Sequence, residues 1–367
     1  MNKFVDQNNQ IDQDVAELFG QNLVTFFRST LLRCRINPGL TLALFRILRD
    51  QKRGVRLRSA LAKQGLTVPP LMIVSITNAC NLNCKGCYAR AIHAEEETVM
   101  SDSRLAELIG EANDLGVSII MIAGGEPLLR PIFFDLARQY PHILFPVFTN
   151  GLLINPASIS RFKKQRNLVP ILSLEGHQME TDMRRGSGVY AMVQKKMDWL
   201  RKEGILFGTS LTLTRTNFDL ITSVAFQKDL SKLGSQVSIF VDYVPVQPGT
   251  ETYTLTPEQK GLESTWTKQL YAELPGVFVS LPGDESLYGG CLAGGRGFIH
   301  VNPSGRVEPC PFAPFSDTDL NKMSLREALD SSFLSIIREN AGKLGESAGG
   351  CTLWENREWV LEQLDKE

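Results

Sequence analysis

Six short apolar runs that alternate with amphipathic segments constrain the fold of this 367-residue chain more than any other feature. The runs are nearly continuous in Val, Ile, Leu and Phe, which is typical of strands covered on both faces. They lie at 71–76, 118–122, 143–148, 169–174, 206–213 and 237–244. Segments with helical periodicity lie at 102–113, 132–138, 189–202 and 218–232. Six βα units predict a parallel α/β sheet with right-handed crossovers, either doubly wound or curled into a barrel.

Residues before this alternation follow a helical pattern. Residues 13–33 carry apolar side chains at helical spacing, and a second helix is expected from about Leu40, after an Asn-Pro-Gly break. We therefore predict an N-terminal helical extension at 1–66, followed by the main α/β domain at 67–250.

The sequence after Pro245 is less regular. A β-hairpin is expected at 297–309, with its turn at Asn302–Gly305, and a helix is expected at 324–339. These short elements predict a small C-terminal α+β module over residues 251–367.

Composition limits the classes of function. Hydrophobic residues make up 43% and charged residues 22%, a balance typical of folded globular proteins. A formal net charge of −1 argues against nucleic acid as a partner. The first residues are too polar for a secretory signal, and no apolar run is long enough to span a bilayer, so a cytoplasmic location is expected.

One stretch departs from this charge balance. Residues 28–63 hold ten Lys and Arg but a single acid, Asp50. This pattern fits a pair of helices with a solvated basic face, or a peripheral contact with an anionic lipid surface or anionic partner. Both interpretations stay open from the sequence.

Three of the seven cysteines lie within eight residues, directly after the first predicted strand. Cys80, Cys84 and Cys87 have the C-x3-C-x2-C spacing, and thiolates are the preferred ligands of iron–sulfur clusters. Three ligands leave the fourth iron of a cube open for a substrate or cofactor. The alternative is a zinc site in a non-catalytic protein, with His93 as the nearest fourth ligand.

Further motifs lie where later strands end, and chemistry at the C-terminal strand ends is typical of barrels. They are Gly124-Gly125-Glu126-Pro127, Thr149-Asn150-Gly151, Ser173-Leu174-Glu175 and Tyr243-Val244-Pro245. With the cysteine spacing, this order resembles the radical S-adenosylmethionine (SAM) superfamily over about residues 70–250. The resemblance implies a partial (β/α)6 TIM-type barrel.

The resemblance also implies which residues meet SAM and its 4Fe–4S cluster. Cys80, Cys84 and Cys87 would hold the cluster, whose open iron binds the methionine end of SAM. The cofactor contacts implied are Tyr88, Gly124, Gly125, Glu126, Pro127, Asn150, Ser173, Glu175, Arg185 and Val244.

The chain departs from the family pattern at two of these places. Gly86 stands where relatives often have an aromatic residue, and Glu175 stands where many have Asp. The arginines at 184 and 185 would pair with the cofactor carboxylate or a substrate anion, or lie on a solvated loop.

A second cysteine set consists of Cys291, Cys310 and Cys351. Its cysteines flank the predicted hairpin and resemble the SPASM/twitch extensions of the same superfamily, which implies an auxiliary 4Fe–4S cluster of the twitch type. The fourth ligand would be a non-cysteine residue, Cys34 or an open site for substrate. Unrelated structural cysteines or one zinc ion are the alternatives.

The implied reaction is reductive cleavage of SAM to a 5′-deoxyadenosyl radical, which abstracts hydrogen from a substrate. An electron donor of the flavodoxin or ferredoxin type is the expected partner. The substrate stays open among a peptide, sugar, lipid and cofactor precursor, with a peptide maturase or a lipid-modifying enzyme as alternatives. No catalytic base is predicted, since neither His177 nor His300 carries a recognisable signature.

Overall fold

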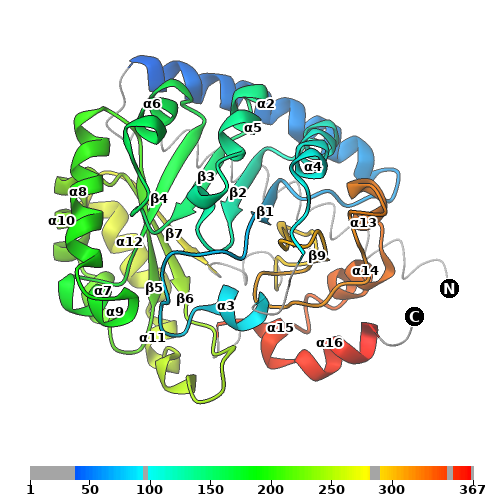
Figure 1. The fold of residues 1–367 in the computed structure, drawn as a ribbon. Helices are drawn as coiled ribbons and strands as arrows, with labels where there is room; N and C mark the ends of the chain where they lie inside the picture. The colour runs from blue at the N-terminus through cyan, green and yellow to red at the C-terminus, as the bar shows by residue number, and fades with distance from the viewer. Residues whose placement is uncertain (1–37, 94–97, 282–289, 345–349, 365–367) are drawn as a thin grey trace.

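The computed structural model describes residues 38–93, 98–281, 290–344 and 350–364 (Figure 1). The helix expected at 13–33 and Cys34 lie outside the described residues.

A single nine-stranded sheet forms the centre of the molecule (Figure 1). Its spatial order is β7-β6-β5-β4-β3-β2-β1-β8-β9, and all neighbours are parallel except the antiparallel β8–β9 hairpin. The strands are β1 Leu71–Ser75, β2 Ile119–Ala123, β3 Phe145–Thr149, β4 Leu168–Leu174, β5 Gly208–Leu213, β6 Val237–Asp242, β7 Val277–Leu281, β8 Phe298–Val301 and β9 Val307–Glu308. Within the described residues, β7 and β9 form the two open edges. The predicted partial TIM-type barrel is confirmed.

The sheet extends beyond the six predicted strands on both sides. β7 lies next to β6, so residues 251–281, which we assigned to the C-terminal module, add one more parallel strand to the barrel. β8 pairs with β1, with Met72 opposite Ile299. The hairpin expected at 297–309 is therefore present, but it continues the main sheet. The division into three parts stays a prediction, and the sheet crosses its boundary at residue 250.

Helices and short 3₁₀ turns connect the strands. The helices are α2 Pro38–Ala62, α3 Tyr88–His93, α4 Asp102–Leu115, α5 Phe133–Gln139, α6 Pro156–Lys164, α7 Gln178–Arg185, α8 Val189–Lys202, α9 Phe218–Ile221, α10 Val224–Leu233, α11 Pro257–Gly261, α12 Glu263–Glu273, α13 Leu325–Leu329, α14 Ser332–Glu339, α15 Thr352–Glu355 and α16 Arg357–Leu364. The 3₁₀ turns are η1 Pro127–Leu129 and η2 Glu251–Tyr253. Two predicted helices are each broken in two, because Ser223 and Ser331 cap new helices α10 and α14.

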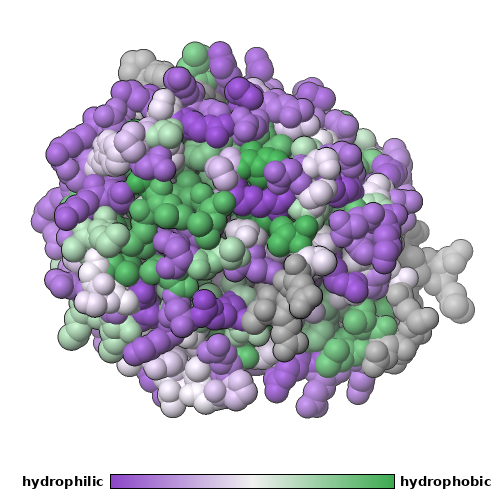
Figure 2. All heavy atoms as spheres, in the orientation of Figure 1, coloured by the Kyte–Doolittle hydropathy of each residue, from purple (hydrophilic) through white to green (hydrophobic). Residues whose placement is uncertain are grey.

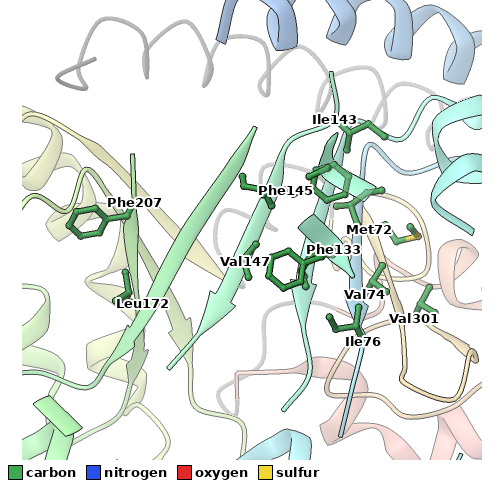
Figure 3. Close-up of a cluster of buried hydrophobic side chains, with 14 of the residues drawn as sticks. Met72, Val74, Ile76, Phe133, Ile143, Phe145, Val147, Leu172, Phe207 and Val301 are labelled. Atoms are coloured by element: carbon green, nitrogen blue, oxygen red, sulfur yellow. The ribbon is translucent and has the colours of Figure 1, made fainter. Parts of the chain in front are cut away.

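Apolar side chains lie on both faces of the sheet. Met72 and Val74 pack in the outer layer between sheet and helices, together with Phe133 of α5 and Phe145 of β3 (Figure 3). The alternate residues of the strands face the barrel interior, where Ile47 of α2 packs with residues such as Leu71. α2 thus covers the end of the barrel where strands begin, and α3 and α7 lie at the opposite end (Figure 1).

Polar side chains dominate the outer surface of the helices. On the face drawn in Figure 2, hydrophilic residues surround the rim and hydrophobic surface lies toward the middle. Along α2, Arg46, Arg49, Lys52 and Arg53 are exposed. A contact of this basic face with anionic lipid stays a prediction. In the part of the chain that the structure describes, no helix is long and apolar enough to cross a membrane.

Candidate functional site

The motifs predicted at successive strand ends meet around one loop, residues 76–87, which we call the cysteine loop. The Gly-Gly-Glu-Pro motif lies directly against it, since Gly125 N donates to Thr77 O at 2.7 Å and Glu126 N donates to Ala79 O at 2.8 Å. A Cβ at Gly125 would lie 2.2 Å from Ala79 O, so only glycine permits this approach.

Glu126 links the ends of β2 and β3. Its carboxylate, which is fully buried, accepts hydrogen bonds from Thr149 Oγ1 at 2.7 Å and from the backbone N–H groups of Asn150 and Leu128 at 2.8 and 3.0 Å. Burial raises the pKa of Glu126, and these three donors oppose that shift. Asn150 Nδ2 in turn donates to Asn81 Oδ1 in the cysteine loop at 2.8 Å. The side chains predicted to meet the cofactor therefore also brace its loop.

Glu175 follows β4 and binds two arginines of α7. Its carboxylate lies 2.7 Å from Arg184 Nη1 and 2.6 Å from Arg185 Nη2, and only 2% of its side chain is exposed. Both arginines also lie near Cys84, where their charges lower the thiol pKa that burial raises. The solvated-loop alternative for Arg184 and Arg185 is therefore wrong. These two guanidinium groups occupy the Glu175 carboxylate. The expected contact of Glu175 with the ribose of SAM stays a prediction.

Tyr243, which follows β6, fills the space beside Gly86. A Cβ at Gly86 would lie 2.5 Å from Tyr243 Oη and 3.0 Å from its Cε2. An aromatic side chain at position 86 has no room in this structure. The ring of Tyr243, which is distant in sequence, thus fills the space beside Gly86, where relatives often have an aromatic residue. The predicted cofactor contact Val244 directly follows Tyr243 and is buried.

The first cysteine set is more accessible than the second. Cys80 is exposed, and Cys84 and Cys87 are partly buried. Partial burial raises the pKa of the Cys80 and Cys84 thiols. An open first site suits a centre that must admit a cofactor.

The spacing of the thiols bears on the zinc alternative. Among the described residues, no three His, Cys, Asp or Glu side chains lie close enough together to hold one metal ion. A zinc ion brings its sulfur ligands to about 2.3 Å from one centre, whereas a 4Fe–4S cube binds each thiolate at a different iron. The described residues thus contain no ready-made zinc site. The His93 side chain, considered as a fourth zinc ligand, lies outside the described residues.

The second cysteine set comes together in a separate apolar core. Cys291, Cys310 and Cys351 are all buried in it. The Cys310 and Cys351 thiols are hydrogen-bonded, which together with burial raises the pKa of Cys310 well above its usual value, and Cys291 adds to the same shift. Three segments far apart in the sequence therefore bring their cysteines into one apolar core. A Cβ at Gly290 would lie 2.1 Å from Ala341 O, so the glycine before Cys291 permits this packing.

Tyr88 lies between the two cysteine sets. It follows Cys87 at the start of α3, and its ring meets the ring of Phe312 edge-on at 4.8 Å. Burial raises the pKa of Tyr88, and Cys87 and Cys310 both add to this shift, so the tyrosine is close to one thiol of each set.

A buried hydrogen-bond chain that the sequence did not reveal joins β1 to the β8–β9 hairpin. His300 Nε2 lies 2.8 Å from Ser75 Oγ, and His300 Nδ1 lies 2.7 Å from Glu308 Oε2. Asn302 Nδ2 donates to the other Glu308 oxygen at 2.9 Å. The order Ser-His-Glu is that of a nucleophilic triad, but all these residues are at least 98% buried, so no substrate reaches the serine. This hydrogen-bond chain has a structural role, and its Glu308 lies two residues before Cys310.

Comparison with known proteins decides the family. The sequence model described as the Radical SAM superfamily matches residues 74–219, which include the cysteine loop and the motifs on β2, β3 and β4. The chain carries a radical SAM domain over these residues. It is a radical SAM enzyme, and the family implies SAM and a 4Fe–4S cluster as cofactors.

Curated relatives of this radical SAM enzyme fall into at least two groups. An AdoMet-dependent heme synthase of Methanosarcina barkeri is 27% identical over 71% of the chain and 81% of the relative. The mycofactocin maturase MftC of Mycobacterium ulcerans is 27% identical over 68% of the chain and 70% of the relative.

Solved structures share the fold. SuiB of Streptococcus suis, bound to S-adenosylmethionine, has a TM-score of 0.63 at 17% identity, over 79% of this chain and 73% of that one. The anSMEcpe structure with bound AdoMet has a TM-score of 0.59 at 16% identity, over 81% of this chain and 98% of that one.

The site suits the implied cofactors. Three thiols on one loop lie beside two guanidinium groups, which complement the negative charge that thiolate ligands bring to a cluster. Sequence reasoning named most residues that meet at this loop. It missed Asn81, Arg184 as a distinct contributor, and the ring of Tyr243, because each acts through a partner from another strand end.

Proposed function

We propose that Cys80, Cys84 and Cys87 hold a 4Fe–4S cluster whose open iron binds the methionine end of SAM. The loaded cluster supplies the electron that cleaves SAM into methionine and a radical able to abstract hydrogen from a substrate. The observation that carries this proposal is the convergence of the ends of β2, β3 and β4 on the cysteine loop.

The chain's own residues orient the cofactor in this proposal. Arg185 faces Cys84 and pairs with the carboxylate end of SAM, while Glu175 sets its direction. The backbones of Gly124 and Gly125 line the side of the loop, and Glu126 and Asn150 fix it in place. Ser173, Pro127, Tyr88 and Val244 are the remaining residues that we assign to the cofactor.

We also propose that the second cysteine set holds an auxiliary 4Fe–4S cluster. Support comes from the burial of Cys291, Cys310 and Cys351 in one apolar core and from the contact between the last two thiols. Held by these three thiols, an auxiliary cluster would supply either an electron acceptor for oxidation of the substrate or a binding site for it. Tyr88 lies near one thiol of each set in this scheme.

The external electron donor would be a flavodoxin or ferredoxin. The exposed Cys80 marks the side of the first cluster from which such a donor could approach.

A peptide maturase is the second candidate function. α7 and α8 expose Met179, Met183 and Met192, the first two to 73% and 61%, and flexible thioether side chains suit the binding of variable peptides. The relative MftC is named a maturase, and one SuiB structure is described as bound to the precursor peptide SuiA. Release of 5′-deoxyadenosine that rises with a candidate peptide, together with a change in the peptide's mass, supports this function; a response to porphyrins alone contradicts it.

Iron content and variant spectra test both cluster proposals. Anaerobically reconstituted protein should contain about eight iron and eight sulfide per chain, and Cys84→Ala and Cys310→Ala should each contain about four. Cys84→Ala should lose SAM cleavage under strong reductant, and Cys310→Ala should keep it. Full iron content in either variant would contradict the cluster assigned to that cysteine.

A further inference from the structure

The segment between Cys84 and Cys87 is held by three hydrogen bonds that join it to Arg184 of α7. Lys85 N donates to the backbone oxygen of Arg184 at 2.9 Å. The Arg184 side chain returns two bonds to the same segment, from Nε to Lys85 O at 3.1 Å and from Nη2 to Gly86 O at 3.5 Å. One arginine of α7 therefore grips both residues that separate two proposed cluster ligands.

Arg184 is itself fixed in this position. Its Nη1 atom donates to Thr212 Oγ1 on β5 at 2.7 Å and lies 2.7 Å from Glu175 Oε2. The planar guanidinium group thus meets four partners from three segments, which a lysine ammonium on a flexible stem cannot reproduce. Glu175 and Thr212 decide where the arginine points.

Tyr243 closes the other side of Gly86. Its ring lies under the Arg184 guanidinium at 5.9 Å and meets the ring of Tyr253 edge-on at 5.6 Å. Gly86 has φ of +63°, and any Cβ there would collide with Tyr243 Oη. The arginine and the tyrosine therefore restrict residues 85–86 to one backbone conformation that glycine alone adopts readily.

We infer that Arg184 and Tyr243 form a latch that fixes the distance between Cys84 and Cys87, with Glu175 as the residue that positions the latch. This inference rests on the proposed cluster at Cys80, Cys84 and Cys87. It divides the two arginines by role: Arg184 holds the cysteine loop, and Arg185 faces the cofactor. Glu175 acts through both arginines, which accounts for its buried carboxylate.

If the latch holds the cysteine loop, its loss should speed the release of iron from the cluster. Arg184→Lys keeps the positive charge but loses the forked contacts to Lys85 O and Gly86 O. We expect iron to leave the reconstituted variant for a chelator on the order of tenfold faster than from the wild type, the size of effect typical of lost second-layer contacts at metal sites. Arg184→Gln should release iron equally fast and should also shift the cluster to a more negative reduction potential, because a cation beside the thiolates is lost.

Arg185→Lys is the matched control. Arg185 pairs with the same carboxylate, but its hydrogen bonds among the described residues go to Glu175 and not to the loop. Its iron release should stay within about twofold of the wild type. Equal iron release from Arg184→Lys and the wild type would overturn the latch. Equally fast release from Arg185→Lys would also overturn it, because the effect would then belong to any disturbed partner of Glu175 and not to the contacts with the loop.

Hydrogen exchange separates failure of the latch from failure of the cluster proposal. In the cluster-free protein, Arg184→Lys should raise the exchange of the Lys85 and Gly86 amides above that of the wild type, whether or not the chain binds iron. Absence of iron from the reconstituted wild type would contradict the proposed function and leave this comparison valid. Unchanged exchange at residues 85–86 in Arg184→Lys would overturn the latch by itself.

Discussion

The fold leaves the thiols of the first cysteine set at least partly accessible and buries those of the second, and alkylation measures this difference. In cluster-free protein, Cys80, Cys84 and Cys87 should react with iodoacetamide while the native state persists, because they lie on a partly open loop. Cys291, Cys310 and Cys351 should react only after unfolding, since all three are buried.

The pH dependence of this alkylation follows from the thiol pKa values. Burial raises the pKa of Cys84, so its thiolate fraction at pH 8 is below that of a free cysteine and grows as the pH rises toward and beyond 9. Labelling of Cys84, read by peptide mass spectrometry, should therefore lag behind that of glutathione at pH 8 and approach it at higher pH. Rapid labelling of Cys310 in the native protein would contradict the buried second site.

The ion pairs of Glu175 make a second prediction for single residues. Glu175→Gln leaves two largely buried guanidinium groups without their carboxylate, which should lower the free energy of unfolding by about 2–4 kcal/mol. Glu203→Gln is the control, because its pair with Lys163 at 2.8 Å lies in the solvent and should contribute less than about 1 kcal/mol. Urea denaturation of cluster-free protein measures both. Equal losses in the two variants would mean that burial does not strengthen the Glu175 pairs.

Among the elements, the hairpin β8–β9 depends on its buried hydrogen-bond chain. His300→Leu removes the imidazole that joins Ser75 to Glu308 and leaves both without that partner, so we expect a loss of about 2–4 kcal/mol in the free energy of unfolding.

His177→Leu is the comparison for that measurement. His177 is exposed, and its recorded ring contact is with Phe226 at 5.0 Å, so a change within about 0.5 kcal/mol is expected. A similarly small loss for His300→Leu in chemical denaturation would show that the buried chain contributes little to holding the hairpin.

Element prediction succeeded where one local pattern decides the structure. The run at 169–174 is apolar except for Ser173, and β4 spans Leu168–Leu174. α8 has the predicted bounds Val189–Lys202, because its apolar positions keep helical spacing throughout. β7 was missed, since only its first two residues are buried and its parallel pairing with β6 is a long-range contact.

The same reasoning explains the site. The motifs on β1, β2, β3 and β4 were predictable, because parallel strands place their C-terminal ends at one edge. The role of Tyr243 was not predictable from the sequence. Its ring fits only because Gly86, which is distant in sequence, has no side chain. His300 was missed for a similar reason: its partners Ser75 and Glu308 come from two other strands.

At the scale of the whole molecule, the continuous sheet argues that the barrel and the C-terminal segment unfold together. β8 is hydrogen-bonded to β1 within the continuous sheet, and α13 packs against α4. Loss of the C-terminal elements would leave one edge of β1 unpaired and remove Val301 from the apolar layer that contains Val74 (Figure 3). Independent unfolding of residues 251–367 would therefore carry a large penalty.

The four tryptophans allow this to be tested. Trp199 and Trp266 pack on the barrel core, and Trp354 and Trp359 pack on the core that contains the second cysteine set. We expect variants that keep only one pair, with Phe at the other two positions, to show urea transitions with midpoints within about 0.3 M of each other in cluster-free protein. Far-UV circular dichroism of each variant controls for any shift caused by the substitutions. A C-terminal pair that reports a clearly earlier transition would instead identify an independently folding module and would support the boundary at residue 250 over the continuity of the sheet.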